Sequence, residues 1–335
     1  MTDVKVPARP ERAWLAVIWL VPGIATLYLL IRREALDAGA APQVYAALTS
    51  LALLLVPLVL LARHDVVIVL RRAVDGHPGR GLALAAAIAA AYLPYWAFAA
   101  NFYLPGLLAV LAMVGAAALG AVGIARREPA GGGDILVVLL LWLPVELRLL
   151  NPAFPWPEGG SGRILAALLA LDCLLFLMLV VRRYDGAGYS FAMSWRDLAV
   201  AIGAFATFTV IAAPLGLSTG FLTVDRQLPG AGDLVLGGAA ILLITGIPEE
   251  VLFRGFLQSF IERRTGRPLL ALILASVLFG VAHLNNGPTP DWRYFMLATI
   301  AGVAYGYVFQ KTKRIGPAAI THMLVDLTWT QFFMG

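Results

Sequence analysis

Ionisable side chains interrupt the most apolar third of this chain at three places. They lie in the runs ITGIPEEVLFRGF, VLFGVAH and THMLVD, and they are Glu249, Glu250, Arg254, His283, His322 and Asp326. An ionisable side chain at membrane depth is energetically costly, so such residues are usually kept for a function. Carboxylates and imidazoles together can activate a water molecule by general acid–base catalysis. The combination therefore predicts hydrolysis, and in particular proteolysis within a membrane.

The acidic pair in the first run has two different environments on a helix. Residues four apart share a helix face, so Glu250 and Arg254 are spaced for an ion pair, with the acid in the favourable N-terminal position. Glu249 is rotated by about 100° around the helix and lacks this partner. A carboxylate without a fixed counter-ion is the better candidate for a general base. We therefore expect Glu249 to act in catalysis, with Glu250 and Arg254 in support.

Two further pairs have the same four-residue spacing. Phe279 lies one helical turn before His283. His322 lies one turn before Asp326, and this aspartate either fixes the tautomer and orientation of the imidazole or shares in holding an anion. Counted at about 1.5 Å per residue from the cytoplasmic helix ends, these groups lie at similar depths. Three helices can therefore bring them to one site.

The composition predicts an all-α, polytopic membrane protein. The chain has 335 residues, of which 60% are hydrophobic and 13% charged, whereas a soluble domain is nearer half apolar and a quarter charged. The single cysteine, Cys173, excludes an intrachain disulfide. The net charge of +5 does not predict nucleic-acid binding, because the basic residues flank apolar segments instead of forming one patch.

About eleven membrane-spanning helices are expected, since a span needs about 20 mostly apolar residues. They lie near residues 14–31, 43–62, 81–101, 104–125, 134–151, 163–181, 197–217, 235–261, 268–283, 292–310 and 315–334. If the N-terminus is cytoplasmic, the inside segments hold eighteen Lys and Arg residues and the outside segments hold five. The positive-inside rule therefore predicts a cytoplasmic N-terminus and an odd number of spans. The first apolar segment is expected to be an anchor rather than a cleaved signal peptide.

The polar motifs divide the chain into two parts. Residues 1–194 are expected to form accessory transmembrane helices, and residues 195–335 are expected to form the catalytic transmembrane core. Frequent Ala, Arg, Leu and Gly suggest a bacterium with GC-rich DNA, and hence a location in the cytoplasmic membrane. The expected partners are the lipid bilayer and a membrane protein or peptide substrate, with no nucleic acid.

The three motifs resemble those of a known family. The patterns EExxxR, FxxxH and HxxxD occur in the order and spacing found in the CPBP family (CAAX protease and bacteriocin-processing, or Abi) of intramembrane proteases, and LFRGFLQ and HLNNG are similar too. The resemblance covers roughly residues 195–335 and implies that Glu249 and His283 activate the water. It also implies that His322 and Asp326 bind the oxyanion or position the substrate. The last position is often Asn in that family and is Asp here, so a hydrogen-bond donor role and an orienting role both stay open.

The same residues are compatible with two kinds of catalysis. Members of this family have been described both as metalloproteases and as glutamate-dependent enzymes that use no metal. If a metal is bound, two imidazoles and a carboxylate form a zinc set of Glu249, His283 and His322. Because no HExxH motif is present, we expect metal-free catalysis without a cofactor.

Three other charged residues lie in apolar segments. Glu146 and Arg148 are two apart and do not share a helix face, so Arg148 is predicted to pair with Asp172 across helices. Such residues either stabilise helix packing or line a substrate groove, and the packing role is favoured on general grounds.

A non-enzymatic protein is the second hypothesis. A transporter, or a bacteriocin-immunity or scaffold protein with the same fold, would use the charged residues to line an ion or solute path. Discontinuous helices in two related halves would favour transport. The sequence has no such internal symmetry, so we favour an intramembrane endopeptidase that acts on membrane-associated, lipidated or tagged proteins.

Overall fold

The chain folds into helices with almost no strand. The computed structural model describes residues 41–155, 162–224, 230–284, 286 and 289–334. Within these ranges the only strands are β1 (Thr223–Val224) and β2 (Phe333–Met334), which pair antiparallel. The predicted all-α class is therefore confirmed. The predicted span at 14–31 and the predicted cytoplasmic N-terminus lie outside the described residues.

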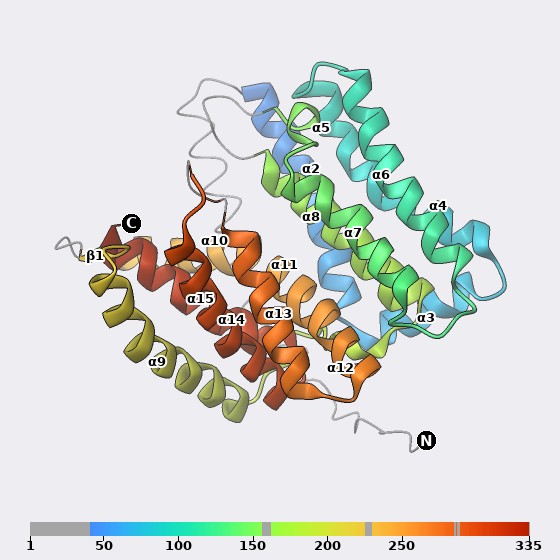
Figure 1. Cartoon of the computed structure of the whole chain (residues 1–335). Coiled ribbons are helices and arrows are strands. Elements are labelled where there is room, and N and C mark those ends of the chain that lie inside the picture. Colours follow the sequence, from blue (N-terminus) through green and yellow to red (C-terminus); the bar gives the residue numbers. More distant parts are fainter. Residues whose placement is uncertain (1–40, 156–161, 225–229, 285, 287–288, 335) are drawn as a thin grey trace.

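The N-terminal group of helices is drawn in blue to green in Figure 1. Its α-helices are α2 (Ala41–Leu61), α3 (His64–Val74), α4 (Pro78–Ala89), α5 (Leu93–Phe98), α6 (Leu104–Gly123), α7 (Gly132–Glu146) and α8 (Arg163–Leu175). Its single 3₁₀ turns are η1 (Ala90–Tyr92), η2 (Asn151–Ala153) and η5 (Asp185–Ala187). α8 continues without a break as the π-helix η4 (Phe176–Val181). Because α8 and η4 are buried along nearly their whole length, they form the core of this group.

The C-terminal group is drawn in yellow to red in Figure 1. Its α-helices are α9 (Trp195–Ser218), α10 (Ala231–Ile241), α11 (Ile247–Glu250), α12 (Ser259–Thr265), α13 (Pro268–His283), α14 (Trp292–Thr312) and α15 (Ile315–Phe332). Two π-helical segments, η6 (Leu242–Gly246) and η7 (Val251–Gln258), join α10, α11 and α12 into one continuous helix. π-Helical turns are rare and frequently occur at functional sites. Here they lie on both sides of the acidic pair.

Local sequence signals explain where several helices begin. Proline occupies the first turn of α4, α6 and α13, where its missing N–H costs nothing. Ser194 caps α9: its hydroxyl accepts from the Asp197 amide (3.2 Å), and the Asp197 carboxylate accepts from the Ser194 amide (2.9 Å). Asp291 caps α14 and accepts from the Arg293 side chain (2.7 Å), and this hydrogen bond lowers the pKa of Asp291.

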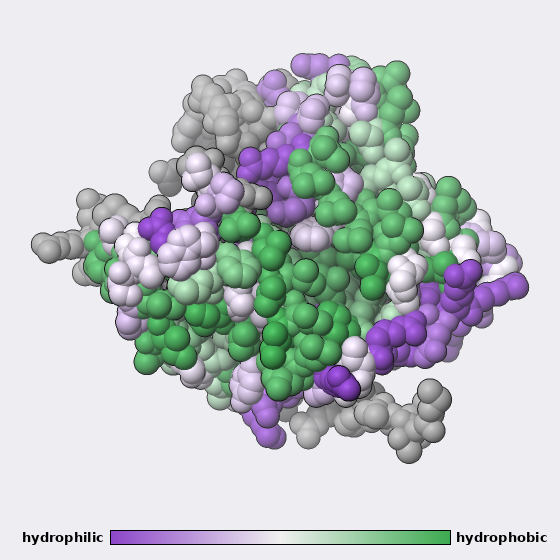
Figure 2. Space-filling model, viewed as in Figure 1, coloured by the Kyte–Doolittle hydropathy of each residue, from purple (hydrophilic) through white to green (hydrophobic). Residues whose placement is uncertain are grey.

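Several helices suit a lipid environment by their length and composition. Among the described residues, six helices are long and apolar enough to cross a membrane, and they are Gln43–Leu61, Pro78–Phe98, Leu104–Gly123, Arg163–Val181, Trp195–Ser218 and Ala231–Thr265. α13 is apolar but shorter, and its exposed side chains include Leu269, Ile273, Leu274, Val277, Leu278 and Val281. Figure 2 shows this apolar surface in green over α13, with hydrophilic side chains gathered along the lower right edge. These surfaces support a multi-pass membrane protein.

The predicted spans from 43–62 onward each coincide with a helix, while the number that cross the membrane stays a prediction. Two local features were not predicted. α3 is a short amphipathic helix in a segment predicted as a loop, with an acidic first turn and a basic last turn that suit the helix dipole. α7 ends at Glu146 instead of near 151, because Arg148 takes a left-handed conformation (φ 59°) that closes the helix.

Candidate active site

The acidic pair lies in α11, between the two π-helical segments. Glu250 is fully buried, and its Oε2 lies 3.1 Å from Nε of Arg254, whose side chain is also fully buried. A buried charge needs such a partner, because the cost of removing it from water is several kcal/mol. The predicted ion pair is therefore confirmed.

Arg254 is held by more than this carboxylate. Its Nη2 donates a hydrogen bond to the carbonyl of Gly302 (3.2 Å). The guanidinium carbon lies 4.6 Å from the centre of the Phe279 ring and 5.3 Å from that of Tyr305. Cation–π contacts of this kind strengthen when water is excluded. Arg254 is thus fixed between η7, α13 and α14, and it helps to fix the carboxylate of Glu250.

His322 on α15 lies among three carboxylates. Its Nδ1 donates a hydrogen bond to Oε1 of Glu250 (2.9 Å). Its Nε2 lies 3.4 Å from Oδ2 of Asp326 and 3.9 Å from Oε2 of Glu249. The predicted contact with Asp326 is present, but the shortest contact is the one with Glu250, which the sequence spacing did not predict. Glu250 is therefore the group that orients the ring through Nδ1.

His283 on α13 presents its other ring nitrogen to Glu249. Its Nδ1 donates a hydrogen bond to the backbone carbonyl of Phe279 (2.8 Å), so a neutral ring carries its lone pair at Nε2. That Nε2 lies 3.8 Å from Oε2 of Glu249. The ring centre is 4.4 Å from that of Phe279 and 5.3 Å from that of Tyr294. One hydrogen bond and two aromatic contacts thus hold His283 in one orientation.

Three helices therefore bring the predicted catalytic residues around Glu249. Its Oε2 is buried and, within the described part of the chain, has no hydrogen-bond partner. The distances of 3.8 and 3.9 Å to the two imidazole nitrogens are too long for direct hydrogen bonds and suit a bridging water molecule. The side chain is 31% exposed and lines a cavity. General-base hydrolysis requires a base within reach of a water molecule, and Glu249 beside two imidazoles in a cavity is compatible with it.

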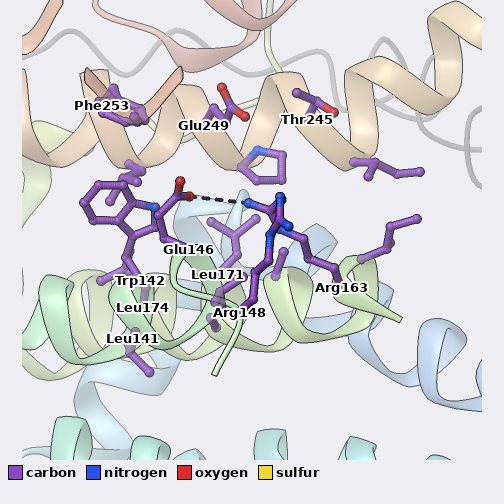
Figure 3. A pocket seen from close by; sticks show the side chains of 18 of the residues that line it. Leu141, Trp142, Glu146, Arg148, Arg163, Leu171, Leu174, Thr245, Glu249 and Phe253 are labelled. Atoms are coloured by element: carbon purple, nitrogen blue, oxygen red, sulfur yellow. Dashed lines mark hydrogen bonds and ion pairs between the residues drawn. The ribbon is translucent and has the colours of Figure 1, made fainter. Parts of the chain in front are cut away.

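The cavity beside Glu249 and His283 has a volume of about 390 Å³. One wall is formed by the segment around Glu249, and the opposite wall is formed by α7 and α8 (Figure 3). Most of its lining is apolar, and three charged side chains lie on the α7–α8 wall: Glu146, Arg148 and Arg163. Both groups of helices thus contribute to the space next to the catalytic residues.

The other predicted intramembrane charges lie in two different places. Glu146 and Arg148 line the cavity, and Oε2 of Glu146 lies 3.5 Å from Nη2 of Arg163. Asp172 is buried inside α8, and neither of its carboxylate oxygens has a hydrogen-bond partner among the described residues. The predicted pair of Arg148 and Asp172 is therefore wrong, because Arg148 follows the end of α7 at the cavity. For Glu146 and Arg148, the groove alternative matches the observed position.

Two tyrosines that no motif indicated complete the site. Tyr305 stacks on the ring of His322, with 4.5 Å between ring centres and 15° between planes, and Tyr294 contacts His283. A signal for Tyr305 was present in the sequence, since Gly302 and Gly306 are four apart and flank it. Small residues at this spacing let membrane helices approach closely, so a side chain between them is placed against the next helix.

Zinc ligation by Glu249, His283 and His322 is the alternative to metal-free catalysis. Within the described ranges, no group of three His, Cys, Asp or Glu side chains is arranged to hold a metal ion. The hydrogen bond from Nδ1 of His322 to Glu250 leaves Nε2 available, an arrangement that is also usual in metal-binding histidines. Metal-free catalysis and the zinc set therefore both stay predictions.

Comparison with known proteins agrees with the resemblance of the motifs. Residues 231–328 match the family model described as type II CAAX prenyl endopeptidase Rce1-like. This segment contains all three motifs and lies in the C-terminal part of the chain. No curated protein and no solved structure shows a significant match. The family match supports a CPBP-family intramembrane protease.

Proposed function

We propose that this protein is an intramembrane endopeptidase that hydrolyses a peptide bond of a membrane-associated substrate with a Glu/His-activated water. The observation that carries the proposal is the position of Glu249, which lies 3.8 Å from Nε2 of His283 and 3.9 Å from Nε2 of His322 and lines a cavity. The apolar helices support a membrane-embedded site, and the match to an endopeptidase family supports the reaction type.

Glu249 acts as the general base in this proposal. A water molecule between Glu249 and Nε2 of His283 gives a proton to the carboxylate while its oxygen attacks the carbonyl carbon of the scissile bond. The C–N bond then breaks, and the proton passes from Glu249 to the leaving amine. Because the Phe279 carbonyl holds Nδ1 of His283, the lone pair at Nε2 is available to orient the water.

His322 and Asp326 act at the carbonyl oxygen of the substrate. Negative charge that develops there is stabilised by a hydrogen-bond donor fixed in a water-poor site. Nε2 of His322 is such a donor when the ring carries both protons, and the carboxylates of Glu250 and Asp326 balance the positive charge of that ring. Stacking on Tyr305 keeps the ring in place.

The proposed substrate is a membrane protein or peptide that is lipidated or tagged near the cleaved bond. The matched family model is described as a prenyl endopeptidase, and the lining of the cavity is mostly apolar. Prenylated proteins, leader peptides and C-terminal sorting tags all have this character.

The Glu249→Gln variant tests the assignment, because it removes the base and keeps the size of the side chain. We expect cleavage to fall at least about a hundredfold, since general acid–base catalysis contributes about 10²–10⁴-fold. Membrane insertion should not change. Complemented deletion strains are compared by mass spectrometry of new protein termini in the membrane fraction.

Glu128→Gln, at an exposed position, is the matched control and should restore the wild-type termini. Identical termini in the Glu249→Gln and wild-type strains would contradict the proposal. That result would favour the non-enzymatic alternative.

Removal of metal ions should leave cleavage unchanged, because Glu249 and the two histidines activate the water without a Lewis acid in this proposal. The measurement is the cleavage rate of purified enzyme after dialysis against EDTA or o-phenanthroline. A rate that falls on chelation and recovers with added Zn²⁺ would instead support the zinc set of Glu249, His283 and His322.

A further inference from the structure

The cavity beside Glu249 has a cationic wall that the proposed mechanism does not use. Arg148 follows the end of α7, Arg163 begins α8, and both line the cavity together with Glu146. Figure 3 shows the two arginine side chains extending toward the segment that carries Thr245 and Glu249. Cationic and catalytic groups therefore share one space.

The charges on this wall do not cancel. Arg163 has a carboxylate partner, since its Nη2 lies 3.5 Å from Oε2 of Glu146. For Arg148, the described residues provide no ion pair or side-chain hydrogen bond. Among the described residues, Arg148 is thus the arginine of this wall that has no carboxylate partner.

The backbone at Arg148 is unusual for an arginine. Its amide donates to the carbonyl of Val145 (3.1 Å), and the amide of Leu149 donates to the carbonyl of Pro144 (2.9 Å). These two bonds form a Schellman motif that ends α7. Arg148 occupies its left-handed position with φ 59°, which glycine adopts without strain and a residue with a Cβ does not. The stability of the helix end therefore does not explain an arginine there.

The surroundings make a guanidinium an effective anion-binding group. Trp142, Leu171 and Leu174 line the cavity from α7 and α8, and Phe253 lines it from the opposite wall. Arg148 is itself exposed, so its guanidinium is accessible to a group that enters the cavity. A guanidinium can also hold both oxygens of a carboxylate at once. A guanidinium at this position can therefore select an anion by its shape.

We propose that Arg148 is a specificity-determining residue that binds a carboxylate of the substrate, on the peptide segment that lies in the cavity. This rests on the proposed endopeptidase function. A peptide is favoured over a lipid headgroup because Glu249 and His283 line the same cavity, so its occupant also reaches the catalytic groups. The carboxylate is a C-terminal carboxylate or an Asp or Glu side chain. Arg148 lies outside residues 231–328, so the preference belongs to the N-terminal helices of this chain.

Three libraries of N-palmitoylated peptides, matched in sequence, separate the two sources of carboxylate. One library has a free C-terminal carboxylate, one has an amidated C-terminus, and one has an amidated C-terminus with one added glutamate. Cleavage by the full-length enzyme in phosphatidylcholine vesicles is followed by mass spectrometry at low peptide concentration, where rates report relative kcat/KM. Wild-type enzyme should prefer one carboxylate library over the neutral library by about tenfold, as expected for one charge-assisted contact.

Variants of Arg148 separate recognition from stability. In Arg148→Gln, the ratio of cleavage rates on the carboxylate and neutral libraries should fall close to one. Arg148→Lys should retain part of the preference, because lysine keeps the positive charge but lacks the paired N–H donors of the planar guanidinium. Arg148→Gly should lose the preference without a lower melting temperature, an outcome that a structural role does not predict. Arg126→Gln changes an exposed arginine outside the cavity and is the matched control, which should keep the preference.

Two kinetic outcomes would overturn the inference. One is equal rates of wild-type enzyme on all three libraries. The other is an equal decrease in the cleavage rates of acidic and neutral peptides in the Arg148→Gln enzyme. A dependence on phosphatidylglycerol that Arg148→Gln removes, without any peptide preference, would assign the arginine to a lipid headgroup instead.

Binding measurements distinguish this inference from the proposed function. Fluorescence anisotropy with the same peptides and the Glu249→Gln variant reports affinity without cleavage. A carboxylate preference in binding, with no cleavage by wild-type enzyme, would contradict the endopeptidase proposal. It would retain the inference that Arg148 binds a carboxylate. Cleavage of all three libraries with no preference in rate or in binding would retain the endopeptidase proposal and contradict the role of Arg148.

Discussion

Glu250 contacts both the buried Arg254 and His322. Its two oxygens have separate partners, since Oε2 lies 3.1 Å from Nε of Arg254 and Oε1 accepts a hydrogen bond from His322. All three side chains are buried, so each depends on the others for its charge balance. Glu250 is therefore a source of stability and a positioning residue for His322.

Glu250→Gln should lower both stability and turnover. It leaves Arg254 buried without a counter-ion, and loss of one partner of a buried ion pair costs roughly 3–5 kcal/mol. It also weakens the hydrogen bond that orients His322. We expect a lower melting temperature in detergent, and a lower kcat with little change in KM, measured on the folded fraction.

A double variant separates these two effects. Glu250→Gln combined with Arg254→Met removes both buried charges, so it should melt at a higher temperature than Glu250→Gln alone. Its kcat should stay low, because the position of His322 is not restored. If kcat returned to the wild-type value, Glu250 would act through stability only.

On the scale of helices, the position of His283 depends on how closely α13 packs against α14. A Cβ at Gly280 would lie 2.7 Å from the carbonyl oxygen of Phe295. A Cβ at Gly302 would lie 3.0 Å from Cα of Ser276. Small residues on both helices are what allow close packing in a membrane, where apolar burial does not drive association. This contact holds the helix end that carries His283.

Gly280→Ala should therefore separate α13 from α14. Overpacking of a close contact costs typically about 1–3 kcal/mol. We expect a lower melting temperature and a lower kcat, since His283 shifts relative to Glu249. Gly203→Ala on α9 is the control, because no atom lies within 4 Å of the added methyl group, and it should change neither quantity. Wild-type behaviour of Gly280→Ala would show that this contact does not position the histidine.

On the scale of the whole molecule, the orientation in the membrane decides which side the cavity faces. The positive-inside rule predicts that Arg126 is cytoplasmic and that Trp292 lies on the other side. Both residues are exposed, and the single cysteine of the chain, Cys173, is buried. Introduced cysteines at these two positions can therefore report the orientation without interference.

Arg126→Cys and Trp292→Cys should be labelled from opposite sides by a membrane-impermeant maleimide. In right-side-out vesicles we expect labelling of Trp292→Cys only, and in inverted vesicles labelling of Arg126→Cys only. Wild-type protein should stay unlabelled because Cys173 is buried. Labelling of both variants from the same side would show that the number of spans predicted between them is wrong.

The sequence alone determined the helical class and the contacts within one helical turn, because both depend on local periodicity. Apolar run length located the helices from 43–62 onward. The four-residue spacing correctly placed Glu250 beside Arg254 and His322 beside Asp326. These features need no knowledge of how one helix packs on another.

Contacts between distant segments were decided only by the tertiary structure. The hydrogen bond from His322 to Glu250 joins residues 72 positions apart, and no local pattern encodes it. The predicted pairing of Arg148 with Asp172 failed because a left-handed backbone turn directs that arginine into the cavity, while α8 packing buries the aspartate. Helix packing sets which side chains meet, and it depends on the fit of whole surfaces rather than on spacing along the chain.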